Sequence, residues 1–280
     1  MFPISLMADR TSAKPRCEIG ATPILRLSML NDRPPKAESE FVLYWMTVAR
    51  RTRWSFALQR AVGWARELKR PLVIIEVLTC GGRWDSDRHH RFVLQGMKVN
   101  AGLLANTPAL YYPFVEADSG ECRKFFEYIC ARACVVVTDD YPIELPSVST
   151  VDDEMPVRVE KIDGNGLLPL KAADQVFPTA YAFRRFLQRS LREYLLDAPM
   201  SDAFAKVKLP RLDSFPDPIP QRWPAASNRL LAGEPAALAG LPIDHSVPPV
   251  PTVERRSFRQ QVSLLLRWKT DPKHTDFYLL

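Results

Sequence analysis

Runs of consecutive apolar residues alternate with segments of helical periodicity through the middle of the chain. The stretches "FVLYWM" (41–46) and "PLVIIEVL" (71–78) are almost wholly apolar, which is typical of parallel strands covered on both faces. Between them, apolar positions recur at helical spacing. These positions are Trp54, Ala57, Leu58, Ala61, Val62, Ala65 and Leu68. The pattern predicts a strand, a helix that ends before Pro71, and a second strand.

The same alternation continues to residue 163. A second helix is predicted over 85–106, with Asp85 or Ser86 as its N-cap, and a third over 121–133. Further strands are predicted over 109–117, 134–142 and 157–163. Strands and helices in this order predict an α/β fold, doubly wound and Rossmann-like, with a parallel five-stranded sheet and helices on both faces.

The regions that flank this pattern are rich in proline. We expect an amino-terminal arm over 1–38, mostly loop, in which 24–30 docks as a short strand. The α/β domain is predicted over 39–198 and ends with a long helix over 180–196. Prolines then recur every few residues over 199–251, which predicts an extended interdomain connector. The remaining 252–280 form a divergent tail with one short amphipathic helix.

Charge and cysteine usage bound the function only loosely. The formal charge of +6 favours polyanionic partners such as nucleic acid, but only mildly. Five cysteines without a CxxC pair indicate buried thiols in a reducing, cytoplasmic compartment. No signal peptide or membrane span is expected. The cysteines are Cys17, Cys80, Cys122, Cys130 and Cys134.

Candidate chemistry lies where the predicted strands end, because open parallel sheets bind ligands at the carboxyl ends of their strands. "CGG" (80–82) is not a dinucleotide fingerprint, and no phosphate-binding P-loop sequence occurs. His89 and His90 are adjacent on a predicted helix, where side chains diverge by about 100°. We therefore expect a solvated helix face there and no metal site. The strand-end candidates are Thr47, Arg50, Arg51, Arg53, 79–82, Glu116, Asp118, 138–140 and 163–166.

Two strand-end groups keep alternative interpretations. Asp139 and Asp140 could bind magnesium or act as acid and base, or one carboxylate could accept backbone N–H groups in a turn ahead of Pro142. The arginines 50, 51 and 53 precede a helix, whose start already carries positive charge. A bound anion, a carboxylate from another segment, or water would compensate them.

Several separate motifs resemble the amino-terminal half of class II DNA photolyases. They are "LNDRPPKAESEFVLYWMTVARRTRWSFALQRAVGWAREL" (30–68), "HRFVLQGM" (90–97), "CVVVTDDYP" (134–142) and "DGNGLLPLKAADQVFPTAYAFRRFL" (163–187). The "YWM" strand, the arginine pair and the helix "FALQRAV" are the most distinctive. The resemblance runs from about Leu30 to the connector near Pro251.

This resemblance implies a light-driven enzyme, deoxyribodipyrimidine photo-lyase, that splits cyclobutane pyrimidine dimers in damaged DNA. In the family, the α/β half carries an antenna chromophore such as a deazaflavin in some members, and a helical half holds FAD and the lesion. An antenna here would be lined by Trp45, Met46, Arg51 and Ser55, with Asp139 as a further candidate, through stacking and polar contacts. Core packing is the alternative for Trp45 and Met46.

The chain also departs from the family. Trp54-Ser55 replaces an Asp-Asn pair of many class II members, and no segment resembles the FAD-binding half. We therefore expect a truncated form, without catalytic residues, that needs a helical partner domain for repair and binds DNA weakly or not at all. The alternative is a non-catalytic or vestigial domain that binds a flavin-like or nucleotide-like ligand. Basic clusters that include Arg184, Arg185, Arg189 and Arg192 are expected to be solvated faces or interdomain contacts.

Overall fold

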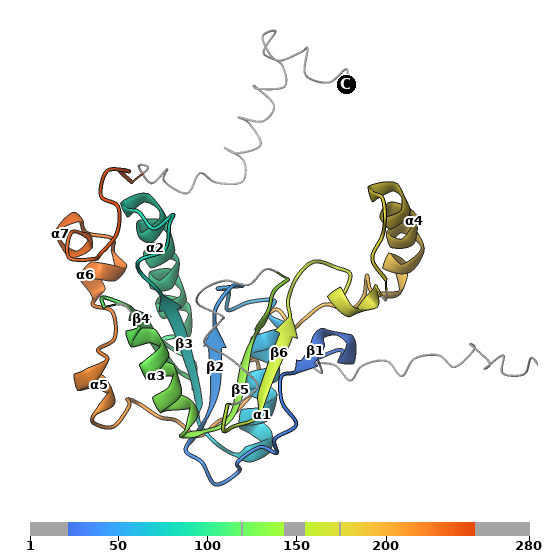
Figure 1. Cartoon of the computed structure of the whole chain (residues 1–280). Helices are drawn as coiled ribbons and strands as arrows, with labels where there is room; N and C mark the ends of the chain where they lie inside the picture. The colour runs from blue at the N-terminus through green and yellow to red at the C-terminus, as the bar shows by residue number, and fades with distance from the viewer. Residues whose placement is uncertain (1–21, 119, 143–154, 174, 250–280) are drawn as a thin grey trace, which may run out of the picture.

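A six-stranded sheet forms the centre of the computed structural model, which describes residues 22–118, 120–142, 155–173 and 175–249 (Figure 1). Its strand order is β1-β6-β5-β2-β3-β4. Every pair from β6 to β4 is parallel, and β1 is antiparallel to β6. The strands are β1 (Leu27–Met29), β2 (Phe41–Met46), β3 (Leu72–Leu78), β4 (Leu110–Val115), β5 (Ala133–Asp140) and β6 (Val159–Asp163).

The α/β, doubly wound, Rossmann-like prediction is confirmed, and the count of five strands is one too low. The five predicted strands form the parallel part of the sheet, and β1 adds a short antiparallel edge. β1 belongs to the segment expected to dock as a strand. Its three residues carry no periodicity from which their pairing could be predicted.

Helices cover both faces of the sheet because successive strand side chains point to opposite sides. Helix α1 (Phe56–Leu68) shares a core with Val42, Tyr44 and Met46. Helix α3 (Glu121–Cys130) packs on the opposite face with Phe41, Leu43 and Trp45. Helix α2 (Asp87–Leu104) contacts β3 and β4, and its Leu104 joins the core of α1.

The helix starts follow from capping residues. Ser55 accepts a hydrogen bond from the backbone N–H of Leu58 at the start of α1, and Ser86 accepts one from His89 at the start of α2. Lys69 ends α1 in the left-handed conformation. The 3-10 helices are η1 (Ile24–Arg26), η2 (Leu170–Ala172) and η3 (Leu191–Glu193).

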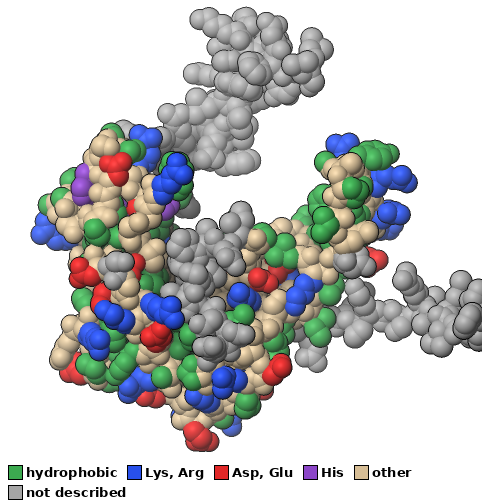
Figure 2. Space-filling model, in the orientation of Figure 1, with side chains coloured by type: hydrophobic (Ala, Val, Ile, Leu, Met, Phe, Trp, Pro, Cys, Tyr) green, Lys and Arg blue, Asp and Glu red, His purple; other side chains and the backbone are tan. Residues whose placement is uncertain are grey.

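Helix α4 (Ala180–Ser190) projects from the body, and none of its residues is buried (Figure 1). Figure 2 shows basic and apolar side chains on this projection. Tyr181 and Phe183 are among the exposed apolar residues there. The predicted long helix is therefore present, but it ends at Ser190 and is followed directly by η3.

The proline-rich segment that follows lies against the α/β body. It contains three four-residue helices, α5 (Ile219–Arg222), α6 (Asn228–Leu231) and α7 (Pro235–Leu238). Trp223 is buried, accepts a hydrogen bond on its carbonyl from Tyr112 (2.6 Å) and donates its indole N–H to Glu121 (2.8 Å). Domain boundaries at 38, 198 and 251 stay predictions, and the tail helix expected after 251 falls outside the described residues.

No helix in the described part of the chain is long and apolar enough to cross a lipid bilayer. The four cysteines within the described ranges are free thiols, and Cys122, Cys130 and Cys134 are buried.

Candidate functional site

The order in which the chain adds strands to the sheet reverses between β2 and β5. From β2 the chain proceeds outward to β3 and β4, then returns to β5 on the other side of β2. Ligands of open α/β sheets bind in the crevice at such a reversal. We call the residues around it, Tyr44, 47–50, Glu76 and Asp139, the switch-point corner.

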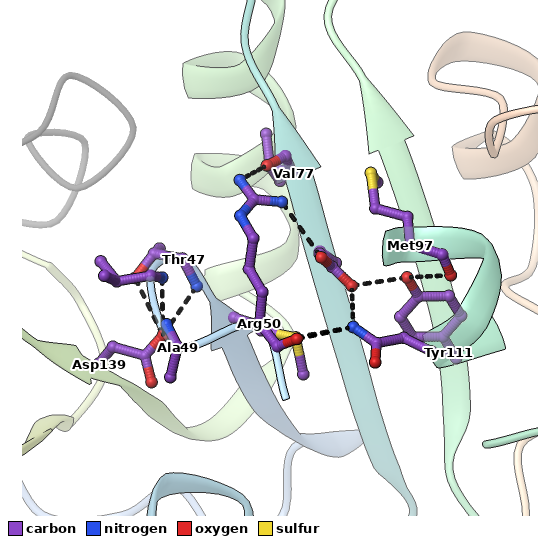
Figure 3. Close-up of polar contacts among 11 residues, drawn as sticks. Thr47, Ala49, Arg50, Val77, Met97, Tyr111 and Asp139 are labelled. Atoms are coloured by element: carbon purple, nitrogen blue, oxygen red, sulfur yellow. Dashed lines mark hydrogen bonds and ion pairs between the residues drawn. The ribbon is translucent and has the colours of Figure 1, made fainter. Parts of the chain in front are cut away.

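Asp139 joins the two strands at this corner. Its carboxylate accepts hydrogen bonds from the backbone N–H groups of Thr47 (3.1 Å), Val48 (2.8 Å) and Ala49 (3.1 Å) (Figure 3). It also accepts one from the hydroxyl of Tyr44 (3.1 Å). The predicted acceptor role is therefore present, but the donors come from the β2–α1 loop and not from a turn ahead of Pro142.

Burial and the Asp139 charge raise the pKa of Tyr44 well above its usual value. The phenol therefore stays protonated and serves as a donor. The Thr47 hydroxyl (3.4 Å) is a fifth donor, so the chain itself supplies the hydrogen-bond partners of the Asp139 carboxylate.

Glu76 forms a second closed network one strand away. This fully buried carboxylate accepts hydrogen bonds from Arg50 Nη1 (3.1 Å), Asn100 Nδ2 (2.9 Å) and Tyr111 Oη (2.7 Å). Arg50 also donates to the carbonyl of Val77 (2.6 Å), and its own carbonyl accepts from Asn100 (Figure 3). For Arg50, the compensating group is thus a carboxylate from another segment.

The Glu76 network also stabilises an unusual loop conformation. Arg50 has a φ of 39°, in the left-handed region that non-glycine residues rarely adopt. Burial and the neighbouring Glu76 raise the pKa of Tyr111, so its hydroxyl remains a donor. Glu76 is not among the site residues predicted from the sequence, although it is the one acid inside the apolar run 71–78.

The structure does not bring the five antenna candidates together. Trp45 and Met46 are fully buried and point to opposite faces of β2. Trp45 packs on Phe126, with ring centroids 4.4 Å apart. Arg51 is exposed and donates to the carbonyl of Gly164 (2.9 Å). Ser55 and Asp139 are engaged as described above.

A flat chromophore ring needs exposed aromatic or apolar surface on which to stack. Of the five candidates, only Arg51 offers an exposed side chain in this arrangement. The residues as placed therefore do not fit a flavin-type ring, and the antenna site stays a prediction that would require Trp45 and Met46 to become accessible.

Two more strand-end carboxylates are engaged by the backbone. Glu116, after β4, accepts from the N–H groups of Gly120 and Cys122 at the start of α3. Asp163, at the end of β6, accepts from Asn165 and Leu170 and lies 3.6 Å from the buried Arg26. These carboxylates position loops, which accounts for their burial.

The start of α2, beside the end of β3, differs from the rest of this edge. We call Cys80, Asp85, His89 and His90 the α2 corner. One ligand atom each from Asp85, His89 and His90 lies within 4.8 Å of the other two. His89 is 53% exposed, as expected for a solvated face, whereas His90 is 0% exposed. The expectation of a solvated face was therefore wrong for His90.

His90 turns inward because its ring reaches the end of β3. Its Nε2 lies 3.2 Å from the carbonyl oxygen of Thr79 and 3.4 Å from Cys80 Sγ. Burial lowers the pKa of His90 against the raising effect of Asp85, and burial raises the pKa of Cys80 to about 12. Both groups are therefore neutral near pH 7.

Comparison with known proteins finds a distant similarity to a photolyase. No family model matches the chain. The deoxyribodipyrimidine photo-lyase of Methanothermobacter thermautotrophicus is 26% identical over 196 residues, which is 69% of this chain and 42% of that protein. The chain thus spans less than half the length of this relative. At this distance, the comparison supports a photolyase-related α/β domain.

Proposed function

We propose that this chain provides the α/β domain of a class II-type photolyase, a DNA-repair lyase that splits cyclobutane pyrimidine dimers with light. Repair would require a helical, FAD-holding half, supplied by the same or another polypeptide. The observation that carries the proposal is the 196-residue similarity to a photolyase, which accounts for 42% of that protein's length. The Rossmann-like strand order and the quoted class II motifs support it.

In this proposal the chain contributes structure and not catalytic groups. FAD, when bound to the helical half, would supply the electron that splits the dimer. The residues of this chain would hold the carboxyl edge of the sheet in one conformation through the Asp139 and Glu76 networks. DNA binding by this chain alone would be weak, salt-sensitive and indifferent to dimers.

The alternative is a non-catalytic domain that binds a flavin-like or nucleotide-like ligand, or none. The occupied acceptor positions of Asp139 and Glu76 favour the version without a ligand at the switch-point corner. Visible absorbance separates the versions. If the purified chain acquires a stoichiometric flavin or deazaflavin spectrum, then the candidate antenna residues are accessible in solution.

A reconstitution assay tests the proposed function. Dimer-containing DNA is illuminated with blue light in the presence of the chain and FAD, with or without a separately produced FAD-holding half of a class II photolyase. We expect repair by the two halves together above that of the helical half alone, and none in the dark. Repair by the chain with FAD alone would contradict the need for a second half. Absence of any gain from adding the chain would contradict the domain assignment.

A further inference from the structure

The α2 corner has the features of a metal site that is independent of photolyase chemistry. It lies at the carboxyl edge of the sheet, where the end of β3 meets the start of α2. Two imidazoles and one carboxylate converge there, with ligand atoms from Asp85, His89 and His90 mutually within 4.8 Å. Imidazole and carboxylate groups are ordinary ligands of zinc and related divalent ions.

His90 carries the strongest indication of a missing ligand. Its side chain is fully buried, yet its Nδ1 has no hydrogen-bond partner. A buried polar atom without a partner is costly and calls for an explanation. In the tautomer in which Nε2 donates to the carbonyl oxygen of Thr79, 3.2 Å away, Nδ1 holds a lone pair.

This tautomer is the one that metal-binding histidines commonly use. A histidine ligand donates its second ring N–H to a carbonyl or carboxylate, which fixes the ring and leaves the other nitrogen for the metal. Thr79 supplies that carbonyl to His90. Asp85 is also held in place, because its Oδ2 accepts the backbone N–H of Gly82 (2.8 Å). Two of the three ligands are thus oriented by the chain.

We propose that Asp85, His89 and His90 bind one zinc-type divalent cation, with a water molecule in the fourth position. A zinc–nitrogen bond of about 2.0–2.1 Å places tetrahedral ligand atoms about 3.4 Å apart. The three ligand atoms must therefore move closer together. His89 is free to do so, because its side chain is 53% exposed and its Nδ1 lies 3.9 Å from Asp85 Oδ1.

The adjacency of the two histidines does not prevent this arrangement. The divergence of about 100° applies to the Cα–Cβ directions of neighbouring helix residues. Side-chain torsions then bring the two rings to a centroid distance of 5.7 Å. Cys80 Sγ lies 3.4 Å from His90 Nε2, on the nitrogen that faces Thr79, and is not one of the three ligands.

Metal titration of the full chain, without an affinity tag and after chelator treatment, tests the proposal. Zn²⁺ is titrated by calorimetry, and Co²⁺ by the visible absorption of a tetrahedral complex. We expect one ion per chain. His89→Gln and Asp85→Asn should each weaken Zn²⁺ binding by about 10-fold or more. A loss of that size is typical when a residue that only orients a metal ligand is replaced, and loss of a ligand itself should cost at least as much. Circular dichroism checks that both variants remain folded.

His245→Gln is the matched control. His245 is an exposed histidine near the same helix start, and its Nδ1 lies 2.9 Å from Asp87 Oδ1, outside the proposed ligand set. Its replacement should leave Zn²⁺ affinity unchanged. The proposal is overturned if the parent chain binds no metal, if His89→Gln binds as tightly as the parent, or if His245→Gln loses as much affinity as His89→Gln.

Discussion

The switch-point corner and the α2 corner lie on the same edge of the sheet but satisfy their polar groups differently. At the switch-point corner, Asp139 and Glu76 are buried and surrounded by donors from the chain. At the α2 corner, a buried nitrogen of His90 has no partner. The comparison teaches that a carboxylate at a strand end is not by itself evidence of a ligand. An unsatisfied buried group indicates a ligand only where other ligand groups converge on it, because Trp45 Nε1 and Thr52 Oγ1 also lack partners without such a cluster in the described residues.

The largest loss of stability is expected when the hydrogen bonds of the switch-point corner are removed. Asp139→Ala removes the acceptor of three backbone N–H groups and of the Tyr44 hydroxyl. Each buried donor left unsatisfied costs about 1–3 kcal/mol, so we expect the free energy of unfolding to fall by about 3 kcal/mol or more. Urea denaturation measures this loss.

The neighbouring carboxylate provides the control. Asp140 is half-buried, and its carboxylate accepts a hydrogen bond from the hydroxyl of Ser28 (3.0 Å). Asp140→Ala should therefore cost only about 0.5–1.5 kcal/mol. Equal losses for the two variants would remove the distinction between a carboxylate that closes the corner and one that lies beside it.

A slightly smaller change in stability is expected when Zn²⁺ binds at the α2 corner. If Zn²⁺ binds only the folded chain, free metal at 100 times its dissociation constant should raise the free energy of unfolding by about 2.7 kcal/mol. Thermal or urea unfolding with and without Zn²⁺ gives the value. His89→Gln should lose most of this gain at the same metal concentration. A gain retained in that variant would place the stabilising ion elsewhere.

The next effect, about 1 kcal/mol in the free energy of unfolding, tests whether Ser55 has a structural role as the cap of α1. Its hydroxyl caps α1 by accepting from Leu58 N–H (3.1 Å), and removal of such a cap by alanine costs about 1 kcal/mol. Ser55→Thr keeps a capping hydroxyl and should retain most of the stability. If Ser55→Ala unfolds like the parent in urea, the capping role is wrong.

The smallest expected effect is a pH dependence of stability that comes from Glu160. This buried carboxylate on β6 also accepts hydrogen bonds only from donors of the chain among the described residues. Burial favours a raised pKa, but hydrogen bonds from Arg60, Trp64 and Arg158 outweigh it and hold the pKa of Glu160 below its usual value of 4.5. Because the folded pKa is the lower one, the stabilisation is present above pH 4.5 and is lost as pH falls through the folded pKa.

Urea midpoints recorded from pH 6 downward would reveal this dependence. The Glu160→Gln variant is the control, because it lacks the titrating group and should show a shallower loss of stability in acid. Identical slopes for the parent and Glu160→Gln would show that this carboxylate contributes nothing to the acid sensitivity.

Most of the fold could be predicted because apolar runs and helical periodicity report burial directly. The five parallel strands follow from runs such as 41–46, which is buried at every position. The pairing of β1 could not be predicted, since three residues carry no alternation. The position of the proline-rich segment on the α/β body could not be predicted either. It depends on contacts such as those of Trp223 with Tyr112 and Glu121, which join residues more than 100 positions apart.

The site was harder to predict for two physical reasons. The donors to Asp139 lie about 90 residues earlier in the chain and meet it only because β2 pairs with β5. The roles of His89 and His90 depend on side-chain torsions, and helical spacing alone suggested two divergent, solvated rings. Glu76, which was not predicted, did have a signal in the sequence, because it is an acid inside an otherwise apolar strand.

A single NMR titration tests the difference between the two corners most directly. Zn²⁺ is added to ¹⁵N-labelled chain while the ring nitrogens of the histidines and the backbone amides of Thr47, Val48 and Ala49 are followed. We predict that one equivalent shifts the ring nitrogens of His89 and His90 and leaves the three amides, which donate to Asp139, in place. Unmoved histidine resonances, or shifts at the three amides, would contradict the account.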